Sequence, residues 1–118
     1  MRWGLMMAAV LLAAGATTGC SSEAEESSMA EEWQRDYCTK LGSWQDVRDG
    51  RIRPGTDPDP AALGRLAVLA AGVLEREGVQ PTGAHLVDDT KMALLGDAKS
   101  EGRAVTYCGD AGFETLVG

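Results

Sequence analysis

The chain has 118 residues, with 18 acidic against 11 basic side chains and a net charge of −7 at pH 7. This length leaves room for one small domain and excludes folds that need about 200 residues or more, such as a barrel enzyme. The negative charge argues against nucleic acid as a partner. Three tryptophans, two tyrosines and one phenylalanine are also too few for an extended base-stacking surface.

The first 19 residues have the pattern of a secretory signal peptide. Arg2 supplies one positive charge, and residues 5–16 form an uncharged apolar run that is too short to cross a bilayer. Gly19 and Cys20 follow the run and resemble a bacterial lipobox, although Thr17 stands where such motifs usually carry an aliphatic residue. The resemblance implies that Cys20 is lipidated and becomes the first residue of the mature protein.

A second cleavage site competes with this one. Ala14, Gly15 and Ala16 form an Ala-x-Ala site, which would release a secreted protein that begins at Thr17. Cysteine pairing favours the lipoprotein, because a lipidated Cys20 leaves Cys38 and Cys108 as an even pair in an oxidising compartment. We therefore expect a protein anchored by lipid at the extracytoplasmic face of the cell membrane, with secretion as the alternative.

The remaining chain predicts a flexible tether and one helical domain. Residues 20–28 are acidic and have little to bury, so they are expected to be a solvated tether. Ser28 and Glu31 have capping-box spacing, and a first helix is predicted over 29–48, with Gly50 as its stop. This helix has an apolar face at steps of three and four residues, made of Met29, Trp33, Tyr37, Leu41 and Trp44.

Two further helices are predicted. Aspartate followed by proline at 57–60 caps a helix over 59–77. This helix is poor in polar groups on nearly every side, so most of its circumference is expected to be buried or closely approached by another helix, at the centre of the domain. A third helix is predicted over 83–108, with Thr82 as its cap and one heptad-like apolar seam along its length. Gly102 is expected to weaken this helix locally, and Gly109 to end it. The prediction is an all-α, three-helix bundle over residues 29–118.

A disulfide between Cys38 and Cys108 is expected to staple this bundle. In an up-down-up arrangement, Cys38 falls two to three turns short of the end of the first helix that Cys108 approaches, so a tilt or a longer third helix has to close the gap. A redox function is disfavoured, because the chain has no Cys-x-x-Cys motif.

The aromatic stripe of the first helix has two interpretations. Trp33, Tyr37 and Trp44 form part of the hydrophobic core, or else they mark an interaction face if an indole is exposed. The core is the favoured interpretation, because apolar residues at helical spacing usually face inward.

Catalytic and metal-binding residues are poorly supported. His85 could act as a general base with Asp88 nearby, but nothing places a nucleophile beside it, and acids at a helix start are explained by the helix dipole. The single histidine does not make a zinc site, and the prolines after Asp57 and Asp59 do not fit a calcium loop. We expect no metal, no cofactor and no catalytic residue.

Taken together, these features resemble small lipoproteins and secreted proteins of actinobacteria. The resemblance is carried by Gly19-Cys20, the Ser/Glu tether, Asp36-Tyr37-Cys38 and Tyr107-Cys108-Gly109. It implies a one-disulfide helical domain at the outer face of the cytoplasmic membrane and brings no activity with it. The expected function is a non-catalytic binding or interaction module for an envelope protein or a small ligand. The alternative is a small-molecule carrier or an enzyme with a site between helices near His85.

Overall fold

The computed structural model describes residues 29–51, 59–79 and 85–118. Four α-helices lie in these ranges: an N-terminal helix over 29–48, α2 (Pro60–Arg76), α3 (Leu86–Leu94) and α4 (Ala98–Asp110), followed by a short 3-10 turn, η2 (Glu114–Leu116). The described residues contain no strand, so the all-α prediction is confirmed, but the three-helix count is wrong. The predicted signal peptide, Cys20, the tether and the Thr82 cap lie outside the described residues.

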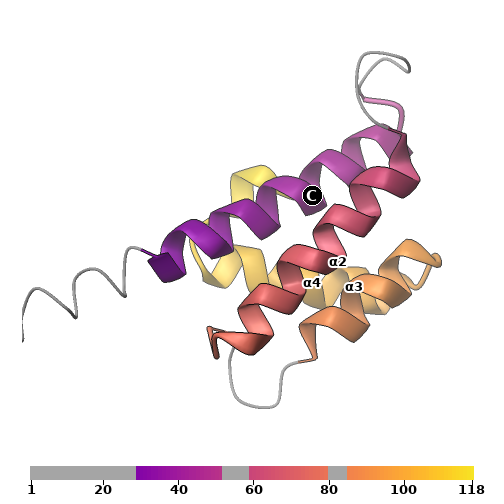
Figure 1. The fold of residues 1–118 in the computed structure, drawn as a ribbon. Helices are drawn as coiled ribbons and strands as arrows, with labels where there is room; N and C mark the ends of the chain where they lie inside the picture. Colours follow the sequence, from indigo (N-terminus) through magenta and orange to yellow (C-terminus); the bar gives the residue numbers. More distant parts are fainter. Residues whose placement is uncertain (1–28, 52–58, 80–84) are drawn as a thin grey trace, which may run out of the picture. The chain divides into compact units, whose positions relative to one another are not determined.

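The first two predicted helices are confirmed almost to the residue. Asp59 caps α2 by accepting a hydrogen bond from the Ala62 N–H at 2.9 Å, and Pro60 takes the first helical position, where its missing N–H costs nothing. Gly50 and Gly78 follow the ends of the N-terminal helix and α2 with positive φ angles. In Figure 1, α2 runs beside the N-terminal helix in the opposite direction.

The third predicted helix is broken into α3 and α4 at Gly96, not at Gly102. Gly96 has φ +100°, a conformation that costs an L side chain about 1–2 kcal/mol, and its N–H donates to the Ala93 carbonyl at 3.0 Å. The Asp97 N–H donates to Met92 at 3.0 Å, which completes a Schellman motif, and the Asp97 carboxylate then caps α4 by accepting from the Ser100 N–H. Asp97 therefore takes part both in the end of α3 and in the start of α4, and the direction of the chain reverses between the two helices (Figure 1).

The same motif corrects the predicted end of the last helix. α4 continues through Gly109 to Asp110, and Gly112 supplies the positive φ angle of +94°. The N–H of Phe113 donates to the Cys108 carbonyl at 2.8 Å, and the Phe113 side chain is buried in the core. The chain therefore folds back onto the helices beyond α4.

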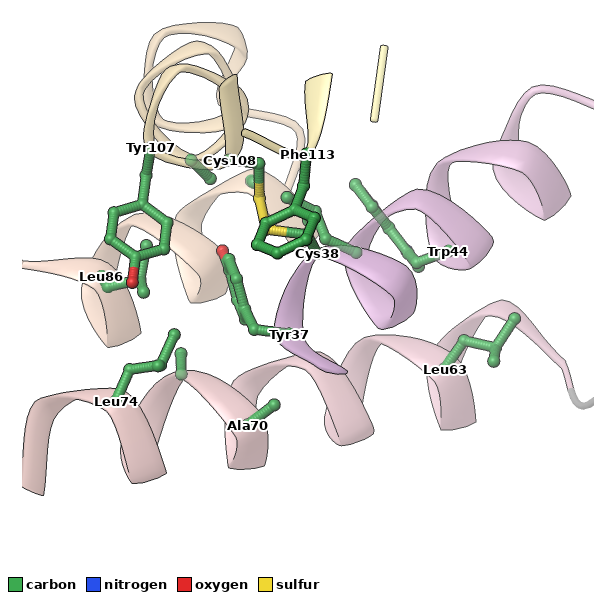
Figure 2. Close-up of a cluster of buried hydrophobic side chains, with 14 residues drawn as sticks. Tyr37, Cys38, Trp44, Leu63, Ala70, Leu74, Leu86, Tyr107, Cys108 and Phe113 are labelled. Carbon is green, nitrogen blue, oxygen red and sulfur yellow. A yellow bond between two sulfur atoms is a disulfide. The ribbon is translucent and has the colours of Figure 1, made fainter. Parts of the chain in front are cut away.

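A disulfide joins Cys38 in the middle of the N-terminal helix to Cys108 in α4, with 5.8 Å between the two Cα atoms. The predicted pairing is confirmed. The reversal at Gly96 makes it possible, because α4 then runs antiparallel to the N-terminal helix, with Glu101 bonded to Arg48 near one end and Cys108 at Cys38 further along, and no extension of a third helix is needed. Both cysteines are fully buried in the cluster drawn in Figure 2, which takes side chains from all four helices.

Two buried hydroxyl groups form a hydrogen bond in the same core. Thr90 donates its hydroxyl hydrogen to the Leu86 carbonyl at 2.7 Å, so the Tyr37 hydroxyl, 2.7 Å from Thr90 Oγ1, is the donor of the second bond. The Tyr37 and Tyr107 rings meet edge to face with 6.1 Å between their centroids. The N-terminal helix is thus held to α3 by a hydrogen bond as well as by apolar contact.

The C-terminal tail packs against the N-terminal helix at a glycine. A Cβ atom at Gly42 would lie 1.7 Å from the Leu116 carbonyl oxygen, so only glycine lets the tail come this close. Gln45 is fully buried beside it, and its side-chain oxygen accepts from the Gly118 N–H at 3.1 Å. The tail is therefore part of the folded unit, which spans residues 32–118.

α2 is less buried than the sequence predicts. Its buried face consists of Leu63, Gly64, Ala67, Ala70, Ala71 and Leu74. Leu66 and Leu69 are 41% and 66% exposed, so the expectation that most of the circumference is buried is wrong. Within the described residues, no helix combines the length and the hydrophobicity that a membrane span requires.

Candidate functional site: a cleft between three helices

The candidate site is an open cleft of about 500 Å³ where the end of the N-terminal helix, the start of α2 and the end of α3 meet. This volume lies in the range of small-molecule sites in proteins. Its lining is mainly apolar, and it consists of Trp44, Arg48, Pro60, Ala61, Gly64, Arg65, Ala93, Leu94 and Gly96.

Small residues make the cleft hollow. Gly64 is buried, and a Cβ atom there would lie 2.8 Å from Leu94 Cδ2, so α2 and α3 are in close contact at the base of the cleft. Gly96 at the end of α3 has open space where a side chain would be. Because Ala61 and Ala93 also carry only a methyl group, a concavity remains between helices that otherwise pack tightly.

One wall of the cleft is an aromatic ring covered by a cation. The Arg48 Cζ atom lies 4.5 Å from the centroid of the Trp44 ring, which is a cation–π contact. Arg48 also donates to Asp49 Oδ1 at 2.8 Å and to Glu101 Oε1 at 2.5 Å. These bonds, first to Asp49 and then to Glu101, raise the pKa of the Arg48 guanidinium above its ordinary value, so its charge is fixed.

The acid behind this wall is itself held by a polar network. The bond from Arg48 lowers the pKa of the Glu101 carboxyl, against a partial burial that would raise it. Gln45 donates to Glu101 Oε2 at 2.7 Å and so joins this network to the C-terminal tail. The orientation of Arg48 at the cleft is therefore fixed by residues of α4 and of its own helix.

Arg65 is the second charged residue of the cleft, and it differs from Arg48 in having no side-chain partner among the described residues. It is exposed, and it forms no ion pair or hydrogen bond with another side chain in the part of the chain that the structure describes. Among the charged residues that line the cleft, Arg65 is thus the one whose guanidinium is free to pair with a ligand. The cleft combines an apolar floor with cationic charge in a chain whose net charge is negative.

The aromatic stripe is divided between the core and this site. Tyr37 is fully buried and Trp44 is 5% exposed, so the core interpretation describes both side chains. Trp33 is partly buried and packs against the same cluster. Trp44 also forms part of the cleft wall, so of the three aromatic residues singled out from the sequence it alone lines the candidate site.

His85 and Asp88 lie elsewhere. His85 occupies the N-cap position of α3 without a side-chain cap bond, and both residues are exposed and absent from the lining of the cleft. The Glu75 carboxylate of α2 accepts from the Val87 N–H at 2.6 Å and caps α3. Asp89 accepts from Arg103 of α4 at 2.9 Å, so the carboxylates around His85 connect helices.

Within the described ranges, no group of three or more histidine, cysteine or acidic side chains is placed to hold a metal ion. Sequence reasoning missed Arg48, Arg65, Gly64 and Gly96. One signal was available for Arg65, because it interrupts an otherwise uncharged stretch of α2.

No protein-family model, no curated protein and no solved structure matches the chain.

Proposed function

We propose that this protein is a non-catalytic binding module at the extracytoplasmic face of the cell membrane, anchored through a lipid on Cys20. Its ligand is a small molecule with an apolar body and one anionic group, held in the cleft between the N-terminal helix, α2 and α3. The observation that carries this proposal is the exposed, unpaired Arg65 at the edge of an apolar cleft.

The chemistry of the lining supports this ligand class. A hydrogen bond to a charged group contributes about 1.5–3 kcal/mol, and a guanidinium presents two N–H groups to a carboxylate or phosphate. The small apolar side chains around it offer the ligand's body a dry surface. A binding role also agrees with the described residues of the lining, which include no carboxylate, histidine, serine or cysteine to act as a base or a nucleophile.

The anchor is supported by the sequence alone. The uncharged run over 5–16 followed by Gly19-Cys20 fits a lipoprotein signal, and lipidation of Cys20 leaves no unpaired cysteine beside the disulfide. Mass spectrometry of the purified N-terminus tests this part separately, since a chain that begins at an unmodified Thr17 contradicts the anchor.

Binding is tested with hexanoate, and with 1-hexanol as the uncharged ligand of matched length. A full-length Cys20→Ser variant carries no lipid, so binding is measured without the anchor. Its NMR spectrum should show shifts of the Trp44 indole N–H and of the Gly64 and Gly96 amides on addition of hexanoate. We expect hexanol to bind at least about 10-fold more weakly, because it lacks the charge that pairs with Arg65.

Two arginine variants separate a specific site from general charge attraction. Arg65→Gln should weaken hexanoate binding about 10-fold. Arg76→Gln removes the same charge from the other end of α2, outside the cleft, and should leave binding unchanged. Equal affinity for hexanoate and hexanol, or equal losses in the two variants, contradicts the proposed ligand.

A further inference from the structure

The outer face of α2 carries a second surface, separate from the core. Ala62, Leu66, Leu69 and Val73 follow one another at steps of four, three and four residues, which places them in one stripe along the helix. Leu66 and Leu69 are 41% and 66% exposed, and Ala62 and Val73 are partly buried. This outer stripe is apolar throughout its length and shares no residue with the buried face.

Charged residues of opposite sign mark the two ends of the outer stripe. Asp59 precedes Ala62 by three residues at the N-cap of α2, and Arg76 follows Val73 by three residues in the last turn. Both are exposed, and Arg76 forms no ion pair with any residue that the structure describes. The six positions therefore repeat at steps of three, four, three, four and three.

This spacing is the same when it is counted from either end of the helix. We infer that the outer stripe of α2 pairs with the same stripe of a second copy of this chain, with the two helices antiparallel about a two-fold axis between residues 67 and 68. Leu66 then lies opposite Leu69 of the second copy, and Ala62 lies opposite Val73. Each Arg76 reaches the Asp59 of the other copy, which makes two ion pairs.

Charge decides the direction of pairing. Antiparallel helices bring each arginine to an aspartate, whereas parallel helices would place Arg76 beside Arg76 and Asp59 beside Asp59. Like charges in contact disfavour the parallel form. Each chain has a net charge of −7, so two copies repel at long range, and these two ion pairs provide the local attraction that aligns the stripes.

The paired surface is small, so the association is expected to be weak. The stripe from Ala62 to Val73 spans roughly 16 Å of helix, less than the interface of a standard permanent complex. Copies held at one membrane would meet at a high effective concentration, which strengthens a weak contact. The inference itself depends only on α2 and stands whether or not the cleft binds a ligand.

Two matched leucines test the surface. The full-length Cys20→Ser chain should form dimers in sedimentation equilibrium at concentrations up to roughly 1 mM. Leu69→Gln should raise the dissociation constant at least about 10-fold, because it places a polar amide opposite Leu66 of the second copy. Leu95 is 80% exposed but lies outside the stripe, so Leu95→Gln should leave the dissociation constant unchanged.

Single cysteines test the direction. A mixture of Ala62→Cys and Val73→Cys chains should form an intermolecular disulfide on mild oxidation, seen as a dimer on a non-reducing gel and assigned by mass spectrometry. Either variant alone should stay uncrosslinked, because the two identical positions lie roughly 16 Å apart along an antiparallel pair. Arg76→Asp should weaken the dimer, and Arg76→Lys should retain it.

A chain that stays monomeric up to roughly 1 mM overturns the inference. A dimer in which Val73→Cys crosslinks to itself overturns the antiparallel register, and so does equal sensitivity to Leu69→Gln and Leu95→Gln. None of these variants changes Arg65 or another cleft residue. Failure here and failure of hexanoate binding are therefore separate results.

Discussion

At the scale of single residues, the core of this protein contains a hydrogen bond that a hydrophobic pattern cannot reveal. The Tyr37 hydroxyl is buried and is satisfied by Thr90, which lies 53 residues further along the chain. Burial raises the pKa of Tyr37 above its ordinary value of 10.0, so this hydroxyl stays protonated in the folded protein. The period of four residues on the N-terminal helix predicts that Tyr37 faces inward, but it does not identify the group that accepts the hydrogen bond from its hydroxyl.

The Glu101 carboxylate should make stability depend on pH in acid. Its folded-state pKa is lowered, chiefly by the bond from Arg48, below the ordinary value of 4.5 that we take for the unfolded chain. The stabilisation is therefore present above pH 4.5 and is lost as the pH falls through the folded-state value. In urea titrations, Glu101→Gln should lower the free energy of unfolding at pH 7, and its difference from wild type should shrink below pH 4.5.

An Arg48→Gln background provides the control for this effect. Without Arg48, the carboxylate loses the principal cause of its lowered pKa, so the cost of Glu101→Gln should vary much less with pH. A cost that is the same at pH 3 and pH 7 in the wild-type background would contradict the proposed linkage.

At the scale of elements, helix ends were predictable where the local start and stop residues do not conflict with the apolar pattern. Gly50 and Gly78 follow the N-terminal helix and α2, Asp59 caps α2, and both helices lie within one residue of their predicted bounds. The break between α3 and α4 also has a signal, glycine followed by aspartate at 96–97. The apolar seam that crosses it predicted one continuous helix, because positions before and after a tight turn can share a spacing by chance.

The cleft and the outer stripe of α2 could not be derived in this way. α2 is rich in apolar residues on nearly every side, so its periodicity does not say which side faces the core. That choice is made by partners distant in the sequence: Leu94 packs against Gly64, and the aromatic residues of the N-terminal helix share one core cluster with Leu63 and Leu74. A candidate site formed by Arg48, Arg65 and Gly96 exists only after three helices have packed.

Two helical glycines should respond in opposite ways to the same substitution. Gly102→Ala introduces a methyl group into open space in α4 and should stabilise the protein by about 0.5–1 kcal/mol, because alanine loses less backbone entropy on folding. Gly42→Ala should destabilise it by about 1–3 kcal/mol, because the new Cβ atom meets the Leu116 carbonyl and displaces the tail. Thermal and urea unfolding measure both changes.

Removing residues 114–118 tests whether the tail is the cause. In the shortened chain the Leu116 carbonyl is gone, so Gly42→Ala should become neutral or stabilising, as Gly102→Ala is in the full chain. An unchanged penalty at Gly42 would show that some other contact of the N-terminal helix requires the glycine.

At the scale of the whole molecule, the Cys38–Cys108 disulfide closes most of the folded unit into one loop. The two cysteines are separated by 70 positions in a unit that spans residues 32–118. By loop-closure entropy, this crosslink destabilises the unfolded chain by about 4 kcal/mol. A domain of this size has a total stability of roughly 5–15 kcal/mol, so the disulfide accounts for a large share of it.

Replacing both cysteines should therefore lower the free energy of unfolding by about 4 kcal/mol and the melting temperature by roughly 20 °C. The Cys38→Ala/Cys108→Ala variant should melt at the same temperature with and without dithiothreitol, whereas the wild-type protein should approach that temperature only when reduced. Because burial of both sulfurs contributes apolar contact as well, Cys38→Val/Cys108→Ala separates packing from loop closure by restoring part of the lost volume. If this variant recovers most of the lost stability, packing and not chain entropy is the main contribution of the crosslink. If it recovers little, the loop constraint holds together a fold whose helices share one small core.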